Sequence, residues 1–294
     1  MNLILQSSSA DMATLHHIAA LTGAQQIIDI DQHGLRCVGV LCTDQLQQQV
    51  ATMALKEAVD VYWEKSPRRL QDFKLLAMDM DSTLITIECI DEIADMQGLK
   101  PQVASITEAA MRGEIAFAES LTRRVALLKG LPASALQQVY DERLKLSPGA
   151  EKLLHTVQSA GLKTLLVSGG FTFFTDRIKE RLGLDFSHSN LLEIIDGRLT
   201  GKVTGLIVDA EEKRRTVERT CVDLGITTGQ AIVMGDGAND LAMMGIAGLS
   251  VAFRAKPVVR AQANVALNFV GLDGLLNILQ GDRNDTAIST GSGI

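Results

Sequence analysis

The sequence has few cysteines, no recognisable signal-peptide pattern and no long apolar run. Its four cysteines include no CxxC pair, which argues against a disulfide framework or a zinc knot and indicates reduced thiols in a cytoplasmic protein. Its apolar runs are far shorter than the roughly 20 residues that span a bilayer. The amino-terminal residues lack the basic and apolar regions of a signal peptide. We therefore expect no membrane partner.

An excess of basic residues is also missing. The chain has 28 Lys and Arg against 35 Asp and Glu, a net charge of -7, so its surface disfavours a nucleic-acid partner. With 46% hydrophobic residues and only 5 prolines, it is neither disordered nor collagen-like. A length of 294 residues favours two units, or one unit that carries an insertion.

Residues 1–70 are expected to form a small α+β domain. Apolar spacing predicts, in order, strand Asn2–Gln6, helix Ser9–Leu21, strand Gln26–Asp31, strand Leu35–Leu41, helix Asp44–Val59 and strand Val61–Trp63. This βαββαβ order is ferredoxin-like and is shared by ACT-type domains. The segment SPRRLQDF is a candidate linker. Nothing in these residues identifies a ligand.

Residues 71–281 are expected to form a larger α/β domain with a Rossmann-like parallel sheet. Its predicted strands are Lys74–Met80, Leu162–Val167, Ala231–Gly235 and Leu249–Phe253. In such a sheet, ligands bind at the carboxyl ends of the strands. A helical stretch at about residues 86–147 is too long for a crossover, so we interpret it as an inserted cap. Residues 282–294 are polar and are expected to be disordered.

Acidic residues follow two of the predicted core strands. Asp79 and Asp81 end KLLAMDMDSTL, and Asp236 and Asp240 end AIVMGDGANDL. The alternative is that Asp81 merely caps a helix with the adjacent serine. If both pairs emerge from the same sheet edge, their carboxylates repel each other unless a cation lies among them, and hard oxygen ligands suit Mg²⁺.

Two further segments are candidates for binding an anion. In LLVSGGF, Ser168 and Gly169 offer a hydroxyl and open N–H groups at the start of a helix, although this is also an ordinary strand-to-helix turn. Lys213 lies in the mixed-charge run DAEEKRRTVERT, where a solvated lysine is the default interpretation.

Taken in order, DMDST, SGG, a downstream lysine and GDGAND resemble the four motifs of the haloacid dehalogenase-like phosphohydrolases, over about residues Phe73–Gln280. The stretches DMDSTLITIECIDEIA, MRGEIAFAESLTRRVALLKGLP and SGGFTFF are similar to the phosphoserine phosphatase family within that group. The resemblance implies a haloacid dehalogenase core with a helical cap. It also implies Mg²⁺-dependent hydrolysis of O-phospho-L-serine, the last step of serine biosynthesis, through an aspartyl-phosphate.

The resemblance also implies roles for individual residues. Asp79 is the expected nucleophile, and Asp81 the general acid and then base. Mg²⁺ is expected on Asp79, the main-chain carbonyl of Asp81, and Asp236, with Asp240 in support. The residues expected to bind the phosphoryl group are Lys213, Ser168, Gly169 and Asn239.

Two cap residues match the family positions that recognise serine. Glu88 matches the acid that meets the substrate ammonium, and Arg124 matches the arginine that binds its carboxylate. Taken alone, Glu88 is more typical of an exposed acid at a helix start, and the motif context reverses that interpretation.

Other functions stay open at this point. The phosphoryl group of the same intermediate can pass to another small alcohol, such as homoserine, instead of water. The chain can also be a catalytically silent amino-acid sensor, which intact motif residues disfavour. The expected partner is a small-molecule substrate, and a homodimer is left open.

Overall fold

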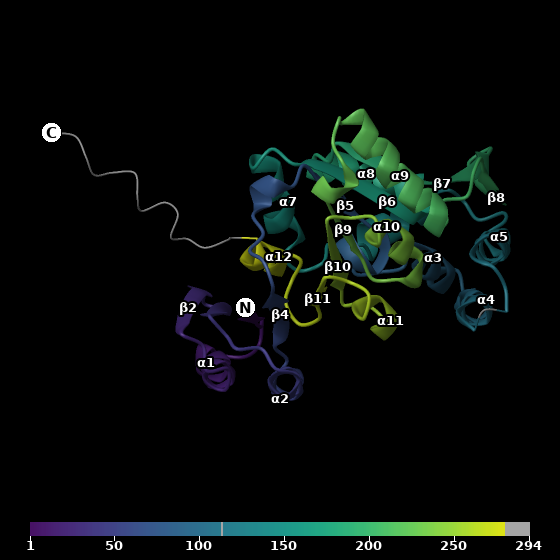
Figure 1. Cartoon of the computed structure of the whole chain (residues 1–294). Helices are drawn as coiled ribbons and strands as arrows, with labels where there is room; N and C mark the ends of the chain where they lie inside the picture. The colour runs from purple at the N-terminus through teal and green to yellow at the C-terminus, as the bar shows by residue number, and fades with distance from the viewer. Residues whose placement is uncertain (113, 280–294) are drawn as a thin grey trace. The chain divides into compact units, whose positions relative to one another are not determined.

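The computed structural model describes residues 1–112 and 114–279, which form two compact units (Figure 1). The first unit combines Met1–Phe73, Pro148–Ala160 and the described residues from Val265 onward. The second combines Lys74–Ser147 and Gly161–Asn264. The expected boundary at residue 70 is close to the end of the first segment, but two later segments belong to the same unit. The division into independent domains stays a prediction, and the tail 282–294 lies outside the described residues.

The amino-terminal part of the first unit has the expected ferredoxin-like topology. Its elements are β1 (Asn2–Gln6), α1 (Met12–Ala20), β2 (Gln26–Asp31), β3 (Gly34–Val38), α2 (Asp44–Lys56) and β4 (Asp60–Glu64). The strands form an antiparallel sheet in the order β2-β3-β1-β4. Alternate residues Leu3, Leu5 and Leu35 are fully buried in the core that also contains Leu15 and Val50 of the helices.

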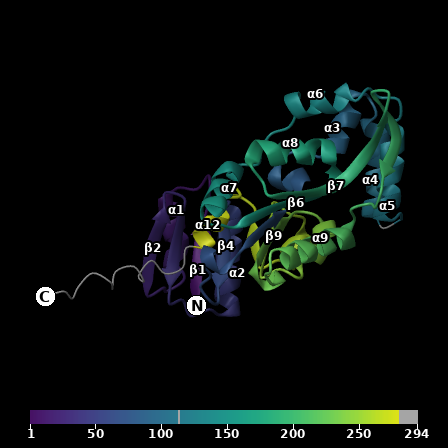
Figure 2. The same ribbon diagram turned by 90° about the horizontal axis from the view of Figure 1, so that it is seen from above.

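Three later elements complete this unit: α7 (Ala150–Ser159), β11 (Val265–Leu267) and α12 (Gly274–Ile278). The helices α7 and α12 lie side by side in both views (Figures 1 and 2). The buried carboxylate of Asp60, at the start of β4, accepts hydrogen bonds of 2.8 to 3.0 Å from the backbone N–H groups of Asn268, Phe269 and Val270. A carboxylate is a strong acceptor, so this cluster fixes the later segment to β4.

The second unit contains the expected parallel sheet. Its strands are β5 (Leu75–Met78), β6 (Lys163–Phe171), β7 (Phe186–Ile195), β8 (Arg198–Thr204), β9 (Ala231–Gly235) and β10 (Leu249–Phe253), in the order β10-β9-β5-β6-β7-β8. All pairs are parallel except β7 with β8. Its other helices are α8 (Thr172–Leu182), α9 (Ala210–Asp223), α10 (Leu241–Met244) and α11 (Pro257–Arg260). The central strands β5 and β9 are buried along their whole length, as their continuous apolar runs predict.

Between β5 and β6 lie four helices of the expected cap: α3 (Cys89–Met96), α4 (Lys100–Met111), α5 (Phe117–Leu127) and α6 (Ser134–Glu142). The β7–β8 hairpin, which was not predicted from the sequence, packs against α5 (Figure 2). Backbone hydrogen bonds of 2.8 Å join Gly130 N–H to the Leu199 carbonyl and Ala133 N–H to the Gly197 carbonyl. The hairpin therefore links the core sheet to the cap.

Among the described residues, every helix is too short or too polar to cross a lipid bilayer.

Candidate active site

The loop after β5 carries Asp79 and Asp81 at the carboxyl end of the sheet. Its Ser82 has a positive φ of 56°, a left-handed conformation that costs a non-glycine residue about 1 kcal/mol or more. Two backbone hydrogen bonds hold the loop, from Ser82 N–H to the Ile87 carbonyl at 3.1 Å and from Ile85 N–H to Met80 at 3.0 Å. They compensate for the strain.

The loop after β9 carries Asp236 and Asp240 to the same edge. Asp240 is fully buried, and its Oδ2 accepts hydrogen bonds from the N–H groups of Asp236 at 3.1 Å and Gly237 at 3.0 Å. The carboxylate lies so close to the end of β9 that a Cβ on Gly235 would be 2.5 Å from it. Glycine is therefore required there. Thr83 donates its hydroxyl to Asp236 Oδ1 at 3.1 Å, which joins the two loops.

Lys213 lies between these loops and is fully buried, so it is not the solvated lysine that its sequence context favours. Its Nζ lies 2.8 Å from Oδ1 of Asp79 and 2.8 Å from Oδ1 of Asp240. Burial by itself lowers the pKa of Lys213, but the carboxylates of Asp240 and Asp79 outweigh it and raise the pKa. The side chain is therefore an ammonium.

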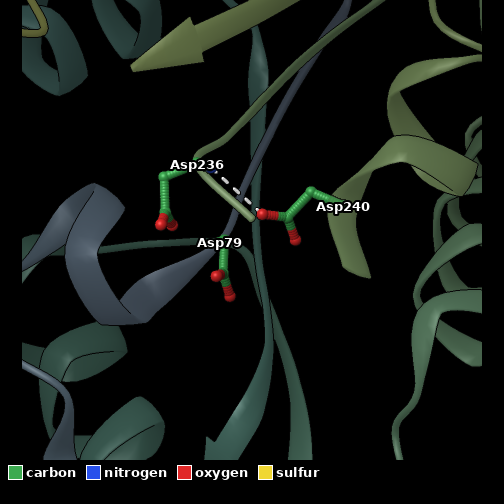
Figure 3. Close-up of side chains that lie close together, drawn as sticks. All are labelled: Asp79, Asp236 and Asp240. Atoms are coloured by element: carbon green, nitrogen blue, oxygen red, sulfur yellow. Dashed lines mark hydrogen bonds between the residues drawn. The ribbon is translucent and has the colours of Figure 1, made fainter. Parts of the chain in front are cut away.

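The three carboxylates of Asp79, Asp236 and Asp240 form one cluster (Figure 3), with an oxygen atom from each within 4.8 Å of the others. Burial raises the pKa of Asp79 well above its usual range. Burial, Asp240 and Glu88 raise the pKa of Asp236 to about 7. One ammonium thus faces three carboxylates, and a divalent cation would supply the missing positive charge.

The hydrogen bonds indicate which oxygens are open to such a cation. Asp240 uses Oδ1 for Lys213 and Oδ2 for two backbone N–H groups. Asp236 receives only the Thr83 hydroxyl among the hydrogen bonds described for its side chain. Asp79 and Asp236 are therefore better placed to be ligands, and Asp240 is better placed to hold Lys213 and the loop.

The carboxyl group of Asp81 lies outside this cluster. Burial, and then the nearby Glu88, raise its pKa well above the usual range, although hydrogen bonds from Cys89 lower it. Among the described residues, none donates a hydrogen bond to its buried Oδ1. A raised pKa favours the protonated form, and a protonated carboxyl group can act as an acid. This environment suits the role that the sequence predicts for Asp81.

The SGG segment at the end of β6 lies beside Asp81. A Cβ on Gly170 would be 3.1 Å from Oγ of Ser168 and 3.2 Å from Oδ2 of Asp81. The same Cβ would be 2.9 Å from Cε of Met80, so the two loops approach too closely here for any side chain at Gly170. The cap covers the neighbouring glycine, since a Cβ on Gly169 would lie 3.0 Å from Cζ of Phe117 in α5.

The cap contributes two side chains of opposite charge, Glu88 and Arg124. Glu88, just before α3, accepts a 2.7 Å hydrogen bond from the Ser82 hydroxyl. The surrounding protein raises its pKa, although the residue is exposed to solvent. The pKa of Arg124 in α5 is lowered, because burial outweighs the opposing effect of the nearby carboxylates of Asp91, Glu88 and Asp81. Among the described residues, none accepts a hydrogen bond from Nε of Arg124, which is buried. The structure thus brings Glu88 and Arg124 into the electrostatic field of the Asp81 loop.

One residue predicted from the sequence has no described contact with the carboxylate cluster, and three further residues near the site were not predicted. Asn239 lies half-buried in the β9 loop with its Oδ1 against Gly237, and no described contact joins it to the three carboxylates. The missed residues are Ser82, Thr83 and Asp91. The first two belong to the DMDST motif, and Asp91 lies one helical turn after Glu88. The sequence shows that these residues lie next to predicted site residues, but it does not show the side chains that they contact.

Comparison with known proteins identifies the family. A family model for haloacid dehalogenase-like hydrolases matches residues 73–248. A phosphoserine phosphatase from a Polaromonas species is 60% identical over 217 residues, which cover 72% of this chain and 92% of the relative.

Two solved structures are similar. A probable phosphoserine phosphatase from Vibrio cholerae, in unliganded form, has a TM-score of 0.81 at 36% identity, covering 95% of this chain and 86% of that one. A phosphoserine phosphatase solved as a phospho-aspartyl intermediate analogue has a TM-score of 0.67 at 38% identity, covering 71% and 99%. The chain therefore belongs to the haloacid dehalogenase-like hydrolases and, within them, to the phosphoserine phosphatase family.

Proposed function

We propose that this chain hydrolyses O-phospho-L-serine to L-serine and phosphate, with Asp79 as the nucleophile. Two sets of charged residues in one site carry the proposal. The first is the carboxylate cluster with Lys213, and the second is the pair Glu88 and Arg124 from the cap. The first group suits phosphoryl transfer, and the second suits an amino acid. The names of the relatives described above support the same substrate.

In the first half-reaction, a carboxylate oxygen of Asp79 attacks phosphorus, and the bond from phosphorus to the serine oxygen breaks. Asp81 gives its proton to that oxygen, so L-serine leaves as a neutral alcohol. In the second half-reaction, Asp81 takes a proton from water, whose oxygen attacks phosphorus and releases Asp79. The raised pKa of Asp81 supports the first of its two roles.

Asp79 must be ionised to attack, and its burial opposes this. The Lys213 ammonium, 2.8 Å away, favours the charged form. We propose Mg²⁺ as the cation of the cluster, held by Asp79, Asp236 and the main-chain carbonyl of Asp81, where it would neutralise charge between the carboxylate and the phosphate. Ser168, Gly169, Lys213 and Asn239 are the proposed groups around the phosphoryl oxygens.

Serine recognition is assigned to the cap. Glu88 would meet the substrate ammonium, and the Ser82 hydroxyl holds the glutamate in place. Arg124 would bind the substrate carboxylate, for which a planar guanidinium is well shaped. The open Nε of Arg124 supports this assignment.

The experiment compares kcat/KM for phosphoserine with kcat/KM for p-nitrophenyl phosphate, which lacks both charged groups of the amino acid. Glu88→Gln and Arg124→Ala should lower the phosphoserine value by about 30-fold or more, because an unpaired buried charge costs roughly 2 to 5 kcal/mol. The aryl phosphate value should fall much less. Arg123→Ala is the matched control, since Arg123 is exposed and paired with Glu119.

Equal losses on both substrates would assign Glu88 and Arg124 to the cap structure and withdraw the serine-recognition claim. Product analysis tests the acceptor. Water as the acceptor gives phosphate and serine in equal amounts with or without added alcohols. A phosphorylated alcohol in place of phosphate would mean a transferase.

A further inference from the structure

Asn190 in β7 is a buried residue whose amide connects three segments of the second unit. Its Nδ2 donates a 2.8 Å hydrogen bond to the carbonyl of Gly169, and its Oδ1 accepts one of 2.9 Å from the N–H of Val208. Only 1% of the residue is exposed. The partners fix the amide orientation, because a carbonyl only accepts and a backbone N–H only donates.

The regular strand pairing does not hold the SGG segment. β6 and β7 pair from Leu165 to Val167 and again at Phe171, with a register shift in between. The peptide groups of residues 168–170 therefore need other partners. The Asn190 side chain supplies one of them, by binding the Gly169 carbonyl from the neighbouring strand.

This hydrogen bond reaches Ser168 through a single peptide group. The carbonyl of the Gly169–Gly170 peptide accepts from Asn190, and its N–H donates to Ser168 Oγ at 2.9 Å. Both ends of a planar peptide are thus fixed. Since Ser168 Oγ accepts this bond, the hydroxyl proton remains to be donated elsewhere.

The amide oxygen of Asn190 binds the segment just before α9, the helix that carries Lys213. Val208 directly precedes Asp209, whose side chain caps α9 by accepting from Glu212 N–H at 2.9 Å. The buried ammonium lies in the first turn of that helix. One side chain therefore connects the segment that carries the serine hydroxyl with the start of the helix that carries the lysine.

We propose that Asn190 is a positioning residue, which orients the Ser168 hydroxyl toward the bound phosphoryl group through the Gly169–Gly170 peptide. The proposal rests on the proposed function only in that a phosphoryl group binds beside Ser168. It does not depend on which alcohol carries that group.

The test is a double-mutant cycle between Asn190 and Ser168. Asn190→Leu keeps a similar volume, adds no charge and removes both hydrogen bonds, and Asn190→Ala is a second variant. Each is made in the wild type and in Ser168→Ala. Asn264→Ala is the control, because Asn264 also bridges two segments, by accepting from Ser250 N–H at 2.9 Å, but it contacts none of the proposed site residues through a described hydrogen bond.

We expect either Asn190 variant to lower kcat about 10- to 100-fold on both phosphoserine and p-nitrophenyl phosphate, a range typical of groups that orient a primary contact. In Ser168→Ala the same change should cost at least about threefold less, because the hydroxyl it orients is gone and only the bond from Val208 N–H is still lost. Asn264→Ala should keep wild-type kcat even where its thermal unfolding temperature falls.

Equal losses in both backgrounds would overturn the proposal, because a merely structural effect is additive. So would wild-type kcat in a folded Asn190→Leu, or failure of both Asn190 variants to fold while Asn264→Ala folds. If the wild-type enzyme showed no preference for phosphoserine, the proposed function would fail, but the cycle measured with p-nitrophenyl phosphate would still decide the role of Asn190.

Discussion

Replacing Lys213 with Met removes an ammonium that lies 2.8 Å from Asp79 and 2.8 Å from Asp240. The methionine has a similar length, so the main change is the loss of charge. Breaking a buried ion pair by removing one partner costs about 3 to 5 kcal/mol, since it leaves a buried charge without compensation. For a unit of this size that corresponds to a fall of roughly 6 to 20 °C in the unfolding temperature.

The loss should depend on pH. Asp79 already has a pKa raised by burial, and removal of the ammonium raises it further. A carboxyl group whose folded pKa exceeds its unfolded value of about 3.9 destabilises the fold increasingly as pH rises above that value. The difference between wild type and Lys213→Met should therefore be small near pH 4 and large at pH 8. Added Mg²⁺ should restore part of the stability that Lys213→Met loses at pH 8.

The assay is thermal unfolding from pH 4 to pH 8, first without divalent cations and then with Mg²⁺. Lys163→Met is the control in the same unit, since Lys163 is half-exposed and pairs with Asp185 at 2.6 Å. Exposed pairs of this kind contribute about 0.2 to 1 kcal/mol. Equal losses in the two variants, or a Lys213→Met loss that is the same at every pH, would refute the electrostatic reasoning.

Three further predictions follow from the same structure. Asp79→Asn should lower kcat by about 10⁴-fold or more in a phosphate-release assay, because an amide is not a nucleophile; substantial turnover would reassign the nucleophile. Burial and neighbouring carboxylates raise the pKa of Asp236 to about 7, so protons compete with the cation below that pH. Calorimetric titration should show Mg²⁺ binding that tightens from pH 6 to pH 8 and then levels off, and a flat profile would contradict this. Asp60→Ala leaves three backbone N–H groups at residues 268–270 without their acceptor. At about 1 to 3 kcal/mol for each group, urea unfolding should show a loss of at least about 3 kcal/mol, with Asp60→Asn milder because it keeps an oxygen.

The position of the site was predictable because the sheet is simple. The runs that end at Asp79 and Asp236 are apolar without interruption, which indicates strands that are buried on both faces. Parallel strands bring their carboxyl ends to one edge, so the two acidic loops had to meet. The structure confirms the parallel sheet on which this reasoning depends.

Lys213 was harder to find because its neighbours in the sequence are charged. Local composition favours a solvated helix, yet the buried face of α9 contains Lys213, Thr216, Val217, Thr220 and Cys221, a spacing of three and four residues. The spacing of residues along α9 thus indicated that Lys213 lies on its buried face. This spacing did not reveal Asp79 and Asp240, the two carboxylates that make burial of the ammonium favourable.

The β7–β8 hairpin was missed for another reason. Its strands mix polar and apolar residues irregularly, with a register shift between Leu192 and Ile194, so the alternation that marks a half-buried strand is absent. The one local signal is the turn Asp196-Gly197. The partners that stabilise the hairpin, around Gly130 and Ala133, come from the cap and are distant in sequence.

The three-segment composition of the first unit has a consequence for the order in which the chain folds during synthesis. The sheet that contains Asp60 leaves the ribosome early, but the backbone groups that bind this carboxylate follow 208 to 210 residues later. Domains generally fold in order from the amino terminus, yet this unit cannot complete its structure until its last segment has been translated. The nascent chain therefore carries a complete sheet in an incomplete unit through most of translation, and the unit that begins first is the one that closes last.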